Sequence, residues 1–255
     1  MSRSFQSGNP ALRDARLQAL YQERIPTQVK RLTIEGVMNK TTLLTAIACA
    51  TGLLSALALY TGFISVGLFF TGSIAVSILT FILAMAICFK PEWAQYLSQI
   101  YAAFEGITLG FITAIFEIES PGIGTQALIL TFAITFGCLT IYRSNIIKDE
   151  YISGKVVMIG LLALIFSYLA GFLMELAGLN YGTVLDGNPI ISLITSVLIF
   201  AFFSYVLLND FKTVRQASRE ELPQYMEWYF AFSILLTLIN VYLEVLRFLN
   251  RMRSK

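Results

Sequence analysis

Apolar residues gather along this chain in seven long segments that are separated by short breaks. The segments lie at roughly 42–61, 65–89, 93–116, 123–142, 156–178, 190–210 and 226–247. Each has about the 20 residues that an α-helix needs to cross the hydrocarbon core of a bilayer. Prolines fall between segments and never inside one, at Pro91, Pro121, Pro189 and Pro223. The pattern therefore predicts an all-α integral membrane protein, a bundle of seven transmembrane helices.

The first break, around Gly62, is the least distinct because no charged residue separates the two segments. A re-entrant pair of half-helices is the alternative to two crossings there. The chain before the first segment is polar and basic, without the early apolar core that a cleavable signal peptide has. We therefore expect two parts, a cytosolic arm at 1–41 and a seven-helix transmembrane domain at 42–255.

Basic residues are distributed unevenly among the breaks. They occur in the arm and in the second, fourth and sixth breaks, whereas the first, third and fifth breaks contain no Lys or Arg. Because cytoplasmic loops carry the excess of Lys and Arg, this alternation predicts a cytosolic N-terminus. Seven crossings would leave Arg251, Arg253 and Lys255 outside, against the same rule. The alternative is a last segment that does not fully cross.

The last segment carries a polar stripe in an otherwise apolar sequence. Its members recur at spacings of 4, 3, 4 and 3 residues and so share one face of a helix: Ser233, Thr237, Asn240, Glu244 and Arg247. A charged side chain at the centre of a spanning helix costs about 2.5–3.5 kcal/mol on insertion scales. We therefore expect this face to point into the protein or a wet cavity, with Glu244 and Arg247 forming an ion pair.

Two more acids lie where the sixth segment ends and the seventh begins. The boundaries above place Asp210 at the cytosolic end of the sixth segment and Glu227 at similar depth. Two close carboxylates cannot both ionise cheaply, so the pair would share a proton and could act as a pH-gated latch. The alternative is a solvated pair that Lys212 and Arg215 neutralise.

Glu105 lies about 18 Å into the third segment at 1.5 Å per residue, close to the bilayer midplane. A carboxylate at this depth is expensive to bury, which favours a role in handling protons or cations. The alternative is a neutral or hydrogen-bonded group that locks helix packing. Gly106 and Gly110 beside it would let another helix approach closely.

The composition excludes several classes of function. Hydrophobic residues make up 56% of the 255 residues, charged residues make up 13%, and histidine is absent. Without histidine there is no imidazole-liganded zinc and no Ser-His or Cys-His catalytic arrangement. The cysteines, Cys49, Cys88 and Cys138, lie far apart and are expected to be buried packing residues. We expect a non-enzyme without cofactor or resident metal, and no nucleic-acid-binding module.

Several motifs between Thr33 and the end of the chain carry a family resemblance. They are Thr33-Ile-Glu-Gly-Val-Met-Asn-Lys-Thr41, Glu105-Gly106, Ile141-Tyr-Arg-Ser-Asn-Ile-Ile-Lys148, Asn209-Asp-Phe211, Tyr225-Met-Glu-Trp-Tyr229 and Tyr242-Leu-Glu-Val-Leu-Arg247. With them the chain resembles the Bax inhibitor-1 family of seven-helix membrane proteins, in particular its bacterial branch. The resemblance implies a bundle whose seventh helix is wrapped by the other six, and a location in the bacterial cytoplasmic membrane.

The resemblance also implies a pH-sensitive calcium leak, gated by two aspartates on the last two helices with an arginine partner. Asp210 matches the first aspartate. The second position, counted back from Arg247, falls at or near Thr237, which carries no charge, and Glu227 is the substitute by depth. The candidate residues for gating and ion passage are therefore Asp210, Glu227, Glu105, Glu244, Arg247, Thr237 and Asn240.

Three hypotheses for function follow. The first is a passive pathway for calcium and protons, since interior carboxylates supply the hard oxygen ligands that calcium takes. The second is a membrane-embedded regulator of a protease or of stress or cell-death machinery, which acts by protein contact through its basic arm. The third is a proton-coupled transporter of an unidentified solute. The expected partners are the lipid bilayer, calcium ions or protons in transit, and, for the regulator, a membrane protein.

Overall fold

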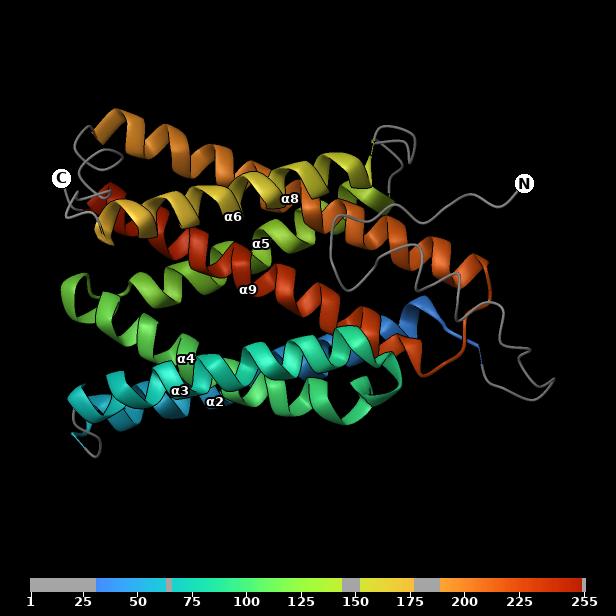
Figure 1. Ribbon diagram of the computed structural model, residues 1–255, viewed down its shortest axis with the longest axis horizontal. Helices are drawn as coiled ribbons and strands as arrows, with labels where there is room; N and C mark the ends of the chain where they lie inside the picture. The colour runs from blue at the N-terminus through green and yellow to red at the C-terminus, as the bar shows by residue number, and fades with distance from the viewer. Residues whose placement is uncertain (1–30, 63–65, 144–151, 177–188, 254–255) are drawn as a thin grey trace.

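The computed structural model describes residues 31–62, 66–143, 152–176 and 189–253. Seven α-helices and one 3₁₀ turn make up the described chain (Figure 1). They are α2 (Ile34–Tyr60), α3 (Val66–Phe89), η2 (Pro91–Trp93), α4 (Ala94–Glu119), α5 (Ile123–Arg143), α6 (Gly154–Leu176), α8 (Pro189–Arg219) and α9 (Met226–Arg253). Each predicted apolar segment corresponds to one helix, so the prediction of an all-α fold is confirmed.

Five of these helices are long and apolar enough to cross a membrane, which makes the chain an integral membrane protein. They are α2, η2 with α4, α5, α8 and α9. Within the described residues, α3 and α6 contribute the shorter apolar segments Ile74–Phe89 and Gly154–Phe166. The count of seven crossings therefore stays a prediction. Helix α2 has 27 residues, about 40 Å of helix, and is long enough to cross without a re-entrant partner.

Helix α9 lies at the centre of the bundle (Figure 1). It packs against α2, α4, α5 and α8, while α3 packs on α4 and α6 packs on α8. The largest fully buried side chains include three aromatic residues within one turn of α9: Tyr229, Phe230 and Phe232. The hydrophobic core is therefore built around the last helix, as the family resemblance implied.

Helix α2 begins at Ile34, eight residues before the predicted start of the first segment. Thr33 caps it, since its hydroxyl accepts a hydrogen bond from the backbone N–H of Gly36 at 3.0 Å. Residues 34–41, which the hydropathy pattern assigned to the polar arm, are thus the first two turns of the helix. The pattern missed them because capping, rather than hydrophobicity, determines where this helix starts.

Helix α8 continues to Arg219, so the prediction that Asp210 ends the sixth helix is wrong. The predicted boundary fell where the first charged residues appear. Those residues remain helical because they have partners inside the fold. Lys212, for example, donates a hydrogen bond from Nζ to the backbone carbonyl of Ile152, just before α6, at 2.6 Å. Asp210 therefore lies about 13 Å inside the helix rather than at its edge.

Helix α9 runs the length of the bundle. Its first turn follows a loop in which Leu222 accepts a hydrogen bond from the backbone N–H of Leu32, beside the start of α2. At its other end, Arg253 donates to the carbonyl oxygen of Pro121 at 2.8 Å, in the turn between α4 and α5. Arg251 donates to the Ser196 hydroxyl at 2.5 Å. These contacts favour full crossing, because they pair the C-terminal arginines at the far end.

Helices α2 and α4 approach each other closely because small residues line both surfaces. Gly106 and Gly110 of α4 lie against the backbone of α2 at Ala48 and Gly52. A Cβ atom at either glycine of α4 would collide with a backbone oxygen of α2. The predicted glycine face is therefore confirmed, and α2 is the helix that it accepts.

Replacing Gly110 with alanine should destabilise this contact, because overpacking of this kind costs about 1–3 kcal/mol. Gly137 of α5 is the matched control, since a Cβ atom there meets nothing within 4 Å. Alanine at that position should instead gain up to about 1 kcal/mol of helix propensity. Thermal unfolding in detergent should give a lower midpoint for Gly110→Ala and an unchanged or higher one for Gly137→Ala. Equal midpoints would contradict this packing.

Candidate functional site

Helix α9 positions polar side chains at three levels along the bundle. Glu227 lies in its first turn, Thr237 near its middle and Glu244 toward its far end. At 1.5 Å per residue these levels are about 15 Å and 10 Å apart along the axis. All three side chains are buried, with exposed fractions of 1–3%. Each level therefore has its own surroundings.

The middle level joins α8 to α9 through Asp210. Its side chain is fully buried and accepts a hydrogen bond from the Thr237 hydroxyl, with 2.5 Å between Oγ1 and Oδ2. Its neighbours along α8, Leu207, Leu208 and Phe211, belong to the hydrophobic core. Thr237 occupies the position that the family resemblance gave to a second aspartate. The residue at that position therefore does contact Asp210, although as an uncharged hydrogen-bond donor.

The second carboxyl oxygen of Asp210, Oδ1, is buried and has no hydrogen-bond partner in the described part of the chain. Ion pairs within the described residues engage Glu221, Glu227 and Glu244, whereas the contact found at Asp210 is with the hydroxyl of Thr237. A buried carboxyl group without a cation beside it is stable only as the neutral acid or with a cation bound. The arrangement is thus able to take up a proton or a cation at Asp210.

The first level fastens the start of α9 to the start of α2 through Glu227. Its Oε1 accepts hydrogen bonds from the Thr33 backbone N–H at 2.8 Å and from the Thr33 hydroxyl at 3.0 Å. Its Oε2 forms an ion pair with Lys40, whose ammonium group lies 5.3 Å from the centre of the Trp228 ring. Gly36 leaves room for the carboxylate, because a Cβ atom there would overlap it.

Two further contacts extend this level to the turn between α8 and α9. Arg31 pairs with Glu221 in an exposed ion pair, and an isolated backbone bridge joins Arg31 to Pro223. We call the residues Arg31–Lys40 and Glu221–Trp228 the clasp. The clasp ties α2 to α9 at one end of the bundle.

Asp210 and Glu227 do not form the shared pair that the sequence suggested. Glu227 is engaged by Thr33 and Lys40, while the partner of Asp210 lies 10 residues further along α9, at Thr237. The corrected end of α8 explains the difference. Because α8 continues past Asp210, that carboxyl group lies about 15 Å deeper along α9 than Glu227.

The third level is the predicted ion pair between Glu244 and Arg247, which is confirmed at 3.0 Å from NH1 to Oε2. Glu244 is 1% exposed, and its Oε1 has no partner within the described residues. Asn240 departs from the predicted stripe, because its side chain is exposed and donates to the Leu236 carbonyl oxygen of its own helix at 2.8 Å. The stripe therefore faces the interior at Thr237 and Glu244 but not at Asn240.

Glu105 lies near the middle of α4, partly buried, and faces α3. The hydroxyls of Thr80 and Tyr101 lie close to its carboxyl group. Tyr101 also meets Phe232 of α9 edge to face, with 5.0 Å between ring centres. Glu105 is thus linked to α9 through an aromatic contact and does not share a site with Asp210.

The partners of Glu227 are the functional residues that sequence reasoning missed. Thr33, Gly36 and Lys40 lie within one family motif, Thr33–Thr41, so a sign of their importance was present. Their contact with α9 was not predictable from the motif, because 187 residues separate Lys40 from Glu227.

Replacing Lys40 with methionine should strongly destabilise the protein. The change leaves the Glu227 carboxylate buried without its cation, and breaking a buried pair costs about 3–5 kcal/mol. Adding Glu227→Gln should restore part of the loss, since the buried charge is then removed as well. Thermal unfolding of the two single variants and the double variant checks this coupling.

Arg31→Met is the matched control for this test. It breaks an ion pair whose side chains are 64% and 58% exposed, and such pairs contribute about 0–1 kcal/mol. A shift of the unfolding midpoint as large as that of Lys40→Met would show that burial of Glu227 does not set the strength of the clasp.

Comparisons with known proteins show similarity over most of the chain. A family model described as Bax inhibitor 1 like matches residues 8–254, nearly the whole chain. An uncharacterised protein of Rickettsia prowazekii (strain Madrid E) is 24% identical over 167 residues, 64% of this chain and 64% of that protein. One of Borreliella burgdorferi is 26% identical over 165 residues, 63% of this chain and 65% of that protein. The match thus spans slightly under two thirds of these curated relatives.

Proposed function

Since the chain belongs to the Bax inhibitor 1 like family, we propose that it is a passive, pH-sensitive leak for cations, chiefly calcium, controlled at Asp210. We place it in a bacterial cytoplasmic membrane with the clasp on the cytosolic side. The bacterial relatives support this choice of membrane, and the alternation of basic residues supports the orientation.

The burial of Asp210 is the observation that carries the proposal. Its carboxyl group is 0% exposed, holds one hydrogen bond to Thr237, and has a second oxygen without a partner among the described residues. An ionisable side chain is costly to bury inside a membrane protein, so such a residue is by default a candidate for function. Gain of a proton or a cation at Asp210 would change its contact with Thr237 and so the closeness of α8 to α9.

The separation of the acidic residues favours the passage of a cation over a lasting cation-binding site. Calcium takes six to eight oxygen ligands in a lasting site. Glu227, Asp210 and Glu244 instead lie at successive levels along α9, which Asp210 contacts from α8, and each has its own partner. A cation that moves along α9 would meet one carboxylate at a time and be released readily.

Thr237 gives this chain a simpler latch than the two aspartates that the family resemblance implied. A threonine hydroxyl does not titrate in the physiological range, so Asp210 is the titrating group of the contact. We therefore expect the pH response to follow a single protonation rather than the two coupled steps of a carboxylate pair.

The replacement Asp210→Asn should leave a calcium leak that no longer responds to pH, because the amide keeps an acceptor for Thr237 but does not ionise. The measurement is calcium-dye flux into proteoliposomes, with internal and external pH varied separately. Glu92→Gln, which removes an exposed acid beside α4, is the control and should keep the wild-type response. An unchanged pH profile in a monodisperse Asp210→Asn protein would overturn the proposal.

Thr237→Val should raise the leak at resting pH. The change keeps the volume of the side chain but leaves a buried acceptor without its donor, which costs about 1–3 kcal/mol. That cost corresponds to a rise in the leak of about 5-fold to 140-fold, since 1.4 kcal/mol is a factor of ten. Thr71→Val is the control, because that hydroxyl is exposed and donates to the Gly67 carbonyl oxygen of its own helix. A leak equal to that of wild type would contradict the role of Thr237.

The second candidate is a membrane-embedded regulator that acts by protein contact. The clasp supports this second candidate, because the clasp fastens the segment that follows residues 1–30 to the turn between α8 and α9. Residues 1–30 of the predicted arm lie outside the described residues. Proteoliposomes that leak no more than empty vesicles at any pH would favour the regulator, and capture of partners with and without residues 1–30 would test it.

A further inference from the structure

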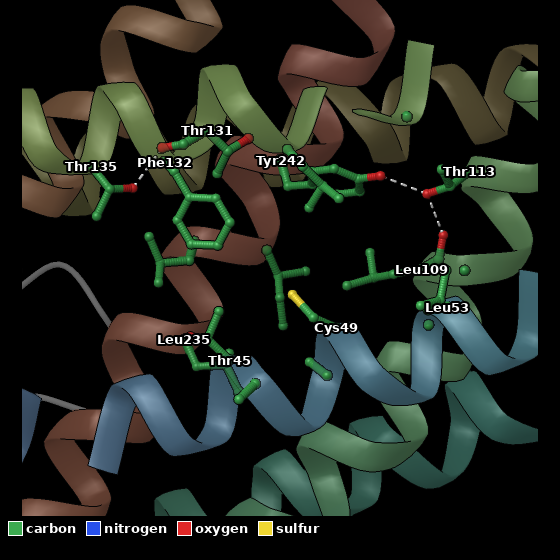
Figure 2. Close-up of a pocket in the computed structure, with 18 of the residues that line it drawn as sticks. Thr45, Cys49, Leu53, Leu109, Thr113, Thr131, Phe132, Thr135, Leu235 and Tyr242 are labelled. Carbon is green, nitrogen blue, oxygen red and sulfur yellow. Dashed lines mark hydrogen bonds between the residues drawn. The ribbon is translucent and has the colours of Figure 1, made fainter. Parts of the chain in front are cut away.

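Helices α2 and α5 stand apart, and a cavity of about 1420 Å³ lies between them (Figure 2). Helices α4 and α9 close it from behind. Figure 2 shows Cys49 of α2 and Phe132 of α5 pointing into the space from opposite sides. The volume exceeds the roughly 300–1,000 Å³ that is usual for pockets that bind small molecules.

The cavity exists because α2 presents short side chains to α5. The cavity wall that α2 supplies is made largely of small residues: Thr45, Ala46, Ala48, Cys49, Gly52 and Ala56. Cys49 was expected to be a buried packing residue, but it is free and exposed. The small side chains that leave room for α4 on one side of the helix thus leave an unfilled space on the other.

The walls are mostly apolar, and the acidic residue among them, Glu117, is already engaged, because its two carboxylate oxygens accept hydrogen bonds from the backbone N–H groups of Gly122 and Gly124. Four threonines of α2 and α5 that line the cavity donate their hydroxyls to backbone carbonyls of their own helices: Thr41, Thr45, Thr131 and Thr135. Behind them, the Tyr242 hydroxyl is paired with Thr113 at 2.7 Å. A water molecule needs two to four polar partners to stay in a cavity. This space is therefore suited to an apolar occupant and is separate from the proposed cation path.

The mouth of the cavity opens between α2 and α5 to the surface that faces lipid. The residues at this opening are large, apolar and exposed: Leu53 at 63%, Leu128 at 39%, Phe132 at 52% and Phe136 at 72%. In a spanning protein such side chains contact acyl chains. The cavity is thus continuous with the lipid-facing surface of the bundle.

The length of the cavity fits a lipid chain. Along α5 it extends from Gly124 to Leu139, about 22 Å of helix. Each leaflet supplies about half of a 30 Å hydrocarbon core, so one acyl chain spans about 15 Å. The inner wall is the central helix itself, at Leu235, Ile239 and Tyr242, which are at most 8% exposed.

We propose that this cavity is a binding site for one acyl chain of a membrane phospholipid, which enters sideways between α2 and α5 and lies against α9. The site goes beyond the proposed cation leak and does not depend on it. An occupied cavity supports α9 on the side where α2 and α5 do not meet. The lipid is thus part of the packing that surrounds the central helix.

The test uses the full chain in vesicles of phosphatidylethanolamine and phosphatidylglycerol, with a trace of phosphatidylethanolamine that carries a photoreactive diazirine at the end of one acyl chain. After illumination, adducts are mapped by mass spectrometry of peptides. The proposal predicts adducts on α9 between Leu235 and Tyr242, which lipids on the outer surface cannot reach. Adducts confined to outward-facing residues such as Leu54 and Phe81 would overturn it.

A pair of variants ties the adducts to the cavity. Cys49→Trp fills the space, so the adducts on α9 should be lost while those on the outer surface remain. Leu54→Trp is the control, because Leu54 is 67% exposed on the same helix and does not line the cavity. It should keep the adducts on α9. Retention of those adducts in a folded Cys49→Trp protein would contradict the site.

Discussion

The burial of α9 is the constraint on which the rest of the structure depends. In an apolar stretch of 18 residues of α9, 78% is buried inside the protein, against 17–39% of such a stretch in the other four candidate spans. A charged group at the centre of a bilayer costs about 2.5–3.5 kcal/mol, so a helix with Glu227, Thr237 and Glu244 on it needs protein around it. Helices α2, α4, α5 and α8 supply those surroundings, while α3 and α6 pack on the outside of α4 and α8.

The hydropathy pattern located every described helix because each one buries or faces apolar surroundings along most of its length. It misplaced three ends, at Ile34, Arg219 and Arg253, since a capping hydroxyl and tertiary hydrogen bonds hold polar residues in these helices. Hydropathy reports where a chain avoids water. It carries no information about which polar groups find a partner inside the fold.

Depth along one helix was predictable, whereas neighbours across helices were not. The family resemblance, counted back from Arg247 along the same helix, pointed to Thr237, and Thr237 is the residue that contacts Asp210. The assignment of Glu227 as the partner of Asp210 failed because it depended on the end of α8. The same limit applies to the cavity: its small residues on α2 are visible in the sequence, but their position opposite α5 is a property of the bundle.

The central claim is that Asp210 and Thr237 act as one contact that restrains cation passage. The most direct measurement is the calcium leak of the double variant Asp210→Asn/Thr237→Val in proteoliposomes, compared with the two single variants at several pH values. If the residues act through one contact, their effects will not add, because residues in contact couple by about 0.5–3 kcal/mol. The double variant should then leak about as much as the more strongly affected single variant. Effects that add fully at every pH would mean that the two residues act independently and would contradict the account.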